Sequence, residues 1–454
     1  MTSLFILFAF LWLFFLLPRL TTRLRNYAFT RINGKNAHHL PSKNLGVDAY
    51  QALYQSKVMT GRSHGSRLAN VVWYLLAPGS HLHQEVMEES DIYHELEATT
   101  KKVMTRSAGD IKNIITECVN RYWQPENKTT YLRDSQMPVW ASFFYQLVFD
   151  ESCTDKETQL IVANAKNFIN TTKFCEFRDM HTRYALVSML EEKIAAGKLR
   201  VDLPSRLTTH EKALHLRGIY FTSGVSQMSE AAAHTLMCLA ENRNLQQRLA
   251  DTPDRFFLNN ILNETFRMFP LFGVAFRIAK RDTSINGIHI DEGAVICFNY
   301  SNYQQAGYEN PQIFDPDRWM SLKKIGEKFM PFGQKGNHSC PAQGVATIAL
   351  GITIQMIVRE SELYTGASHT RALVNRGPCL FLPRGEALPF QHARLLWMKL
   401  TDHLDLSLTS VKQLLVGAYV LLQAQKLRLA SRFWLGEEPI ENEPDSALTE
   451  QTAS

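Results

Sequence analysis

The sequence has little of what would mark a small secreted, zinc-binding or nucleic-acid-binding protein. Its seven cysteines are scattered singly, with no Cys-x-x-Cys pair, which argues against a disulfide scaffold or a zinc module and indicates a reducing compartment. The net charge of +5 over 454 residues is too small to indicate nucleic-acid binding. There is no internal repeat and no glycine-rich nucleotide loop. The length allows one large core or two or three modest domains.

Long apolar runs are scarce too, with an exception at the start. Residues 4–17, LFILFAFLWLFFLL, form an unbroken run of aliphatic and aromatic side chains. With its flanks, the length of this run is close to the roughly 20 residues that are needed to span a bilayer. Pro18 ends the run and Arg19, Arg23 and Arg25 follow, an asymmetry that would leave the following chain on the cytosolic side. Because no basic n-region or cleavage site is present, we expect a retained signal-anchor. The alternative is a buried apolar helix of the main fold.

The stretch that organises the chain is residues 331–346, PFGQKGNHSCPAQGVA. Cys340 ends a polar loop, just before a run that predicts a helix over Gln343 to Glu360. The free amides and the dipole of a helix N-terminus favour a thiolate there. Gly336 has no side chain, which suits a loop that must pass close to a flat group. Such a thiolate is suited to be an axial ligand of haem iron. The alternative is a buried structural cysteine.

This loop resembles the cysteine-ligand loop of the cytochrome P450 family, in which a Phe, a Gly, an Arg or His, and a Cys recur at fixed spacing. Gly336, His338 and Cys340 match that spacing, whereas Phe332 lies one residue too far out, which predicts a local bulge near residues 334–335. The resemblance implies haem b, with Cys340 as the metal ligand and with Phe332, Gly336 and His338 in the cofactor site.

A second group of residues matches the same family. Glu264 and Arg267 stand at i and i+3 in a predicted helix and share one face, and Arg318 follows in the segment FDPDRW. The resemblance implies that these three residues form a structural ionic cluster beneath the haem; an exposed ion pair is the alternative. Arg277, like His338, corresponds to a residue that often meets a haem propionate, and a surface strand charge is its alternative.

The helical run from Leu207 to Leu249 matches the family's helix across the distal face of the haem. In the family a glycine there is followed by an acid and an alcohol that relay protons. In this chain Gly224 is kept, but Ser226 and Gln227 stand in place of the acid and the alcohol. The resemblance implies that Gly224, Ser226 and Gln227 are catalytic residues on the oxygen side, with altered proton delivery. A helix–helix contact at Gly224 is the alternative.

One family feature is missing from the first half of the chain. The helical stretch from Ile92 to Trp123 has no Trp-x-x-x-Arg, which in the family serves a haem propionate. Lys101, Lys102 or Arg106 could substitute, although such a charge run is more often a solvated helix face.

Helical periodicity through the middle of the chain, and alternation around the turn Asn286-Gly287, predict a mainly α architecture with a small β-rich subdomain, as in the P450 fold. The run Leu395–Leu435 is amphipathic with a basic side, so it either packs on the domain, which we expect, or lies on a membrane surface. We expect an N-terminal membrane anchor over residues 1–25 and a haem-thiolate catalytic domain over 26–383. A C-terminal helical extension over 384–436 and an acidic disordered tail over 437–454 would follow.

The resemblance implies a haem-thiolate monooxygenase of the membrane-anchored, eukaryotic, fungal-like type. It would sit on the endoplasmic reticulum with a cytosolic catalytic domain and act on a small apolar substrate, in secondary-metabolite biosynthesis. Since the chain has no flavin or iron–sulfur motif, a separate NADPH-dependent reductase would supply the electrons. Two alternatives stay open. One is a haem-thiolate isomerase, dehydratase or peroxide-using enzyme, and the other is a non-catalytic membrane-anchored haem protein.

Overall fold

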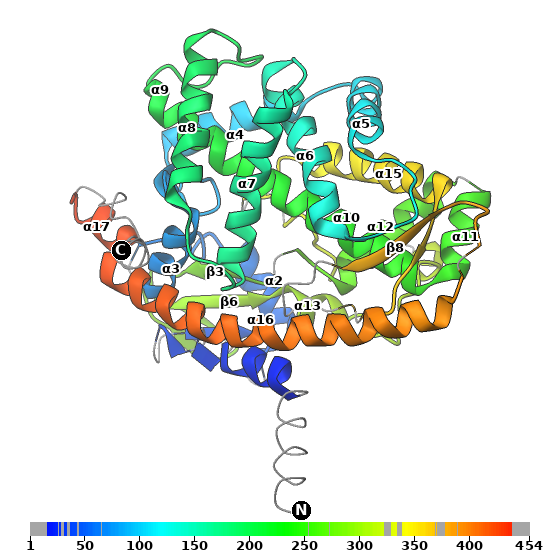
Figure 1. Cartoon of the computed structure of the whole chain (residues 1–454). Coiled ribbons are helices and arrows are strands. Elements are labelled where there is room, and N and C mark those ends of the chain that lie inside the picture. The colour runs from blue at the N-terminus through cyan, green and yellow to red at the C-terminus, as the bar shows by residue number, and fades with distance from the viewer. Residues whose placement is uncertain are drawn as a thin grey trace, which may run out of the picture.

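The predicted fold class, mainly helical with small sheets, is confirmed by the computed structural model (Figure 1). Most of the expected anchor, residues 1–15, lies outside the described residues, and its last part, 16–25, is helical. The expected tail lies outside the described residues from 438 onward. The structure describes residues 16–25, 27–28, 31–33, 37–42, 45–64, 66–252, 254–271, 273–321, 328–333, 338–367, 369, 377–387 and 389–437.

Several helices begin where the sequence supplies a cap. Thr154 and Thr208 cap α7 and α9, each in a reciprocal capping box with the glutamate three residues later. The α-helices are α2 (Val47–Gln55), α3 (Arg67–Leu76), α4 (Asp91–Met104), α5 (Ala108–Tyr122), α6 (Leu132–Phe149), α7 (Asp155–Thr172), α8 (Met180–Ala195), α9 (Thr209–Leu216), α10 (Val225–Glu241), α11 (Arg243–Asp251), α12 (Arg255–Met268), α13 (Tyr300–Gln305), α14 (Arg318–Ser321), α15 (Gln343–Glu360), α16 (Gln391–Leu427) and α17 (Leu429–Trp434).

The run Leu207–Leu249, which the sequence predicted to be helical, is not one regular α-helix. A π-helical turn, η3 (Arg217–Gly224), separates α9 from α10, and Asn242 separates α10 from α11. The longest described helix is α16, with 37 residues. A short 3₁₀ turn, η2 (Ser80–Leu82), follows α3. The π turn shifts the register of side chains just before α10, which bears on the candidate site.

The strands form three small sheets. In the first, β6 (Val295–Asn299) lies between β1 (Ala37–Leu40), which is parallel to it, and β3 (Val274–Ile278), which is antiparallel. The predicted hairpin is present: Asn286 and Gly287, at φ 50° and 75°, join the two strands of a separate pair. The other strands are β4 (Thr283–Ile285) with β5 (Ile288–Ile290), and the antiparallel sheet of β2 (Lys128–Tyr131), β8 (Pro378–Pro383) and β7 (Ser361–Tyr364).

The main hydrophobic core is built around α6 and α10, which pack along one another, with α5, α12 and α15 around them. A separate aromatic core under the first sheet includes Tyr50, whose ring stacks on Tyr303 at 4.0 Å between centroids and meets Phe298 edge-on. The cavity described below lies where these two cores meet.

The C-terminal helices pack on the domain, as expected. Val420 and Ala424 of α16 join Trp73 of α3 in a third core, and the Gln413 side chain donates to the Lys173 carbonyl at 2.8 Å. Figure 1 shows α16 as one long helix along the lower edge of the molecule. In the described part of the chain, the stretch Gln391–Trp434 is long and apolar enough to cross a membrane by length and composition, and 44% of its apolar window is buried.

Candidate active site

A cavity opens between the Cys340 loop and the end of the π turn. Its lining includes Phe332, Gly333 and Cys340 from the loop, and Ser223 and Gly224 from the end of the π turn. The predicted ligand loop and the predicted distal segment, more than one hundred residues apart in the sequence, therefore face one common space.

The Cys340 loop turns sharply before α15. The Cys340 amide donates to the Phe332 carbonyl at 2.8 Å, and Gly333 takes a left-handed φ of 73° that favours glycine. Gly336 and the expected bulge at 334–335 lie outside the described residues. Burial raises the pKa of the Cys340 thiol, the Ala342 amide lowers it, and the nearby Glu85 carboxylate raises it again. The helix N-terminus alone therefore does not make the thiolate, and a bound metal cation is what would hold it.

One end of the cavity is strongly basic. Arg277 and Arg62 are both buried, and each lies near the Glu85 carboxylate, at 3.5 and 3.6 Å. Burial and the neighbouring Arg277 lower the pKa of Arg62 to about 10. Arg277 and His338 line the cavity itself. An additional anion at this end would relieve the crowding of positive charge.

His338 sits at this basic end with one unsatisfied nitrogen. Its ring stacks on Tyr93, with centroids 4.2 Å apart, and its Nδ1 lies 3.1 Å from the Gln84 carbonyl, to which it donates. Its Nε2 is buried without a hydrogen-bond partner among the described residues. Burial, with Arg62 and Arg277 nearby, lowers the pKa of His338 to about 2. With Nδ1 donating, the neutral ring leaves Nε2 as an acceptor, so the two guanidiniums beside it, and not Nε2, are the groups that fit the carboxylates of haem.

The distal segment is only partly arranged as predicted. Gly224 and Gln227 line the cavity, but in the described structure Ser226 does not, and its buried Oγ lacks a hydrogen-bond partner among the described residues. Since successive helix positions turn by about 100°, a residue two places beyond Gly224 faces the other way. A Cβ on Gly224 would lie 2.8 Å from the Phe144 ring. The glycine thus serves a close helix contact as well as the cavity.

The sequence did not reveal a polar pair, His83 and Ser223, on the cavity wall. His83 Nε2 lies 2.8 Å from Ser223 Oγ, and His83 Nδ1 accepts from the Glu85 amide at 3.3 Å. Burial, with His215 and Arg217 nearby, lowers the pKa of His83 to about 3. The neutral ring therefore carries its proton on Nε2 and donates to Ser223, which frees the Ser223 hydroxyl to donate into the cavity.

The three predicted ionic residues lie together. The Glu264 carboxylate, fully buried, accepts from Arg267 at 2.7 and 2.8 Å and from Arg318 at 2.9 Å. The Trp319 indole and the Asp315 amide each add a hydrogen bond at 3.0 Å. This cluster joins α12 to the segment before the Cys340 loop.

The missing Trp-x-x-x-Arg is not replaced by the residues considered above. From α4, Tyr93 and Glu97 line the cavity, whereas Lys101 and Lys102 are exposed. Arg106 pairs instead with an aspartate at the end of α6. The positive charge at this end of the cavity therefore comes from outside α4: from Arg277, which lines the cavity, and from Arg62, which shares its Glu85 partner.

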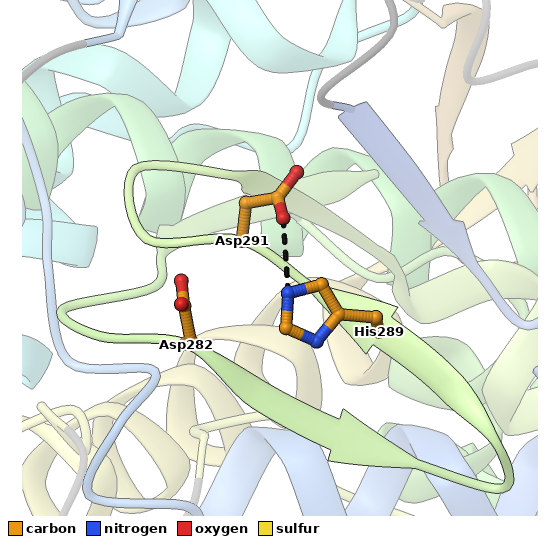
Figure 2. Close-up of side chains that lie close together, drawn as sticks. All are labelled: Asp282, His289 and Asp291. Atoms are coloured by element: carbon orange, nitrogen blue, oxygen red, sulfur yellow. Dashed lines mark ion pairs between the residues drawn. The ribbon is translucent and has the colours of Figure 1, made fainter.

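A separate group of possible metal ligands lies on the β4–β5 hairpin. Figure 2 shows Asp291 and His289 pointing toward each other, 3.1 Å apart, with Asp282 beside them. All three are exposed, and none is among the described residues that line the cavity. Exposed carboxylates keep their water, so this group adds nothing to the candidate site.

Comparisons with known proteins relate the chain to one family. A family model described as Cytochrome P450 matches residues 176–371. Ent-kaurenoic acid oxidase 2 of Arabidopsis thaliana is 31% identical over 106 residues, 23% of this chain and 22% of the relative. Cytochrome P450 3A41 of Mus musculus is 23% identical over 216 residues, 43% of this chain and 42% of the relative. The chain thus aligns with less than half the length of either relative.

Solved structures share the fold across most of the chain. A zebra fish cytochrome P450 with progesterone superposes with a TM-score of 0.63 at 17% identity, over 81% of this chain and 99% of that one. Cytochrome P450 OleT, free of ligand, gives 0.61 at 12% identity, over 76% and 89%. The family match over residues 176–371, the cysteine loop, the buried Glu264 cluster and this fold together support assignment of the chain to the cytochrome P450 family.

Proposed function

We propose that this chain is a haem-thiolate monooxygenase. The observation that supports this most strongly is the cavity that Cys340 and Gly224 line together. In this proposal Cys340 is the iron ligand of haem b, Phe332 and Gly336 flank it, and the basic end of the cavity takes the propionates. When bound, haem supplies the reduction of dioxygen, and its thiolate ligand pushes electron density toward iron.

The balance of the proposed reaction requires an external reductant. One atom of dioxygen enters a C–H bond of the substrate and the other leaves as water, which consumes two electrons and two protons. NADPH, through a separate reductase, would supply the electrons. Met104, Phe144, Met228 and Leu271 line the cavity, which suits a small apolar substrate. A secondary metabolite is the substrate class we favour.

Proton delivery would use residues other than the acid–alcohol pair. Ser223, held by the neutral imidazole of His83 at 2.8 Å, offers a hydroxyl donor on the distal wall. Gln227 lines the same wall and could order water there. Ser226 is buried away from the cavity in the described structure, so we assign it no direct role.

We further propose that residues 4–17 anchor the enzyme in the endoplasmic reticulum, with the catalytic domain in the cytosol. The apolar run and the arginines that follow it support this orientation.

Reductase-coupled turnover tests the proposed function. The haem-loaded full chain, given NADPH and a P450 reductase, should consume oxygen in the presence of small apolar compounds. Cys340→Ser should reduce this rate at least about 100-fold, because the iron loses its electron-donating ligand. A buried cysteine that does not line the described cavity, Cys153, gives the matched control Cys153→Ser, which should retain activity. Equal rates for the wild type and Cys340→Ser would contradict the proposal.

A peroxide-using or isomerising haem-thiolate enzyme is the second candidate. The observation that favours it is that the lining residues contributed by η3 and α10, all within the described structure, include no carboxylic acid. Hydrogen peroxide supporting turnover without NADPH or reductase would favour this candidate. Failure of the folded chain to take up haem would favour a non-catalytic role.

A further inference from the structure

Helix α16 carries a continuous apolar row on the side that faces away from the domain. Trp397, Leu415 and Leu422 are 67%, 70% and 73% exposed. The positions of the row recur at intervals of three, four and seven residues, which keeps them on one helix face. We call this row the outer stripe; its members are Trp397, Leu400, Leu404, Leu408, Val411, Leu415 and Leu422.

The opposite face of α16 is fixed to the protein. Val420 and Ala424 are buried in the third core with Trp73, and Gly417 approaches the Phe174 ring so closely that a Cβ would lie 3.4 Å away. The helix therefore cannot turn its outer stripe inward without losing these contacts. It also cannot cross a bilayer while packed in this way, because a spanning helix needs lipid or other spanning helices around it.

The exposed charges of α16 give it a net positive excess. Within α16, all of whose residues the structure describes, the exposed charged side chains are Arg394, Lys399, Lys412 and Lys426, and two acidic side chains, Asp402 and Asp405, are half-buried. An apolar row of Leu and Trp bordered by Lys and Arg is the composition of helices that lie in the headgroup region of anionic membranes. A protein partner would have to be apolar over the same length, about 55 Å for 37 residues, whereas a membrane presents such a surface everywhere.

The N-terminal helical segment lies on the same side of the molecule. Figure 1 shows this segment, in dark blue, below α16 at the lower edge of the molecule. Leu20 and Leu24 of that segment are 43% and 46% exposed. An apolar segment that enters a membrane from here would bring α16 close to the membrane surface.

From these observations we infer that α16 is a membrane-docking helix whose outer stripe lies in the headgroup–acyl boundary of anionic lipid. It would hold the domain against the membrane in one orientation, in addition to any N-terminal anchor. The inference does not depend on the haem chemistry.

Depth-dependent quenching of Trp397 tests this directly. The full chain is bound to vesicles of phosphatidylcholine and phosphatidylserine that carry bromine on their acyl chains. The Trp397 signal is the difference between the wild type and Trp397→Phe, which removes the contributions of the other six of the seven tryptophans. We expect brominated lipid to reduce this signal to roughly half or less, because an inserted indole touches the acyl boundary.

Two triple variants complete the test. Leu404→Asp, Leu408→Asp and Leu415→Asp together place charge on the outer stripe and should abolish the quenching of Trp397. The control changes equally exposed apolar residues on other elements, Phe256, Ile313 and Met320, which are 81%, 58% and 72% exposed, to Asp and should keep the quenching. Both variants should show the same haem spectrum as the wild type.

Three results would overturn the inference. The first is a Trp397 signal that brominated lipid leaves unchanged in the wild type. This outcome does not depend on whether the triple stripe variant folds. The second is equal quenching in the stripe variant and its control. The third is an unquenched Trp397 in a protein that forms dimers which the stripe variant dissociates, since the stripe would then be a contact between two copies.

Discussion

Replacing Glu264 by Gln should cost the protein a large part of its stability. The Glu264 carboxylate is fully buried and receives hydrogen bonds from two guanidiniums, an indole and a backbone amide. Glu264→Gln keeps the shape but removes the negative charge, so the fully buried Arg267 loses its counter-charge. Breaking a buried ion pair on one side costs about 3–5 kcal/mol. A domain is stable by only about 5–15 kcal/mol in total.

Urea unfolding followed by tryptophan fluorescence measures this loss. Asp317 provides a matched control next to the cluster: it pairs with Arg248 at 3.0 Å, but the two side chains are 50% and 45% exposed. Asp317→Asn should cost less than about 1 kcal/mol, as exposed pairs do. If Glu264→Gln lowered the free energy of unfolding no more than Asp317→Asn does, the buried cluster would not hold the segment before the Cys340 loop, and our reasoning would be refuted.

Three further predictions concern the distal wall and the pH dependence of folding. Gly224→Ala should destabilise by about 1–3 kcal/mol through overpacking, whereas Gly344→Ala, with open space around its Cβ, should be neutral or stabilising; equal effects in thermal unfolding would contradict this. Burial raises the pKa of Glu230, but Lys173, Arg133 and His234 lower it more, to about 2 against an ordinary 4.5. The ionised Glu230 should therefore add up to about 3 kcal/mol to the free energy of unfolding above pH 4.5, and this stabilisation should be lost as the pH falls toward 2. Lys173→Met should make the free energy of unfolding depend less on pH in this acidic range. An unchanged dependence would be inconsistent with the Lys173–Glu230 pair at 2.7 Å. Ser223→Ala should lower the product formed per NADPH severalfold and leave the haem spectrum unchanged, and unaltered coupling would exclude Ser223 from proton delivery.

The parts of the structure that the sequence predicted are those set by local patterns. The helix Gln343–Glu360 has the predicted ends, because a Pro-Ala step precedes it and its apolar residues have helical periodicity. The hairpin at Asn286-Gly287 was readable because those two residue types accept positive φ. Glu264 and Arg267 were predicted to share one face because they stand at i and i+3.

The features that escaped prediction depend on contacts between distant segments. His83 and Glu85 lie in an irregular stretch after η2 with no periodicity, yet His83 meets Ser223 140 residues away and Glu85 meets Arg277 192 residues away. Single-sequence patterns do not contain such tertiary information. Ser226 is a different case: it was expected on the oxygen side, but two positions beyond Gly224 the helical repeat turns its side chain away from the cavity.

The central claim is the bond between the Cys340 sulfur and haem iron. The absorption spectrum of the reduced, carbon-monoxide-treated full chain tests it most directly, with Cys340→Ser and the control Cys153→Ser measured beside it. The account predicts the red-shifted band of a thiolate ligand in the wild type and in Cys153→Ser, and its loss in Cys340→Ser. A wild type that binds haem without that band, or a Cys340→Ser variant that keeps it, would contradict the account.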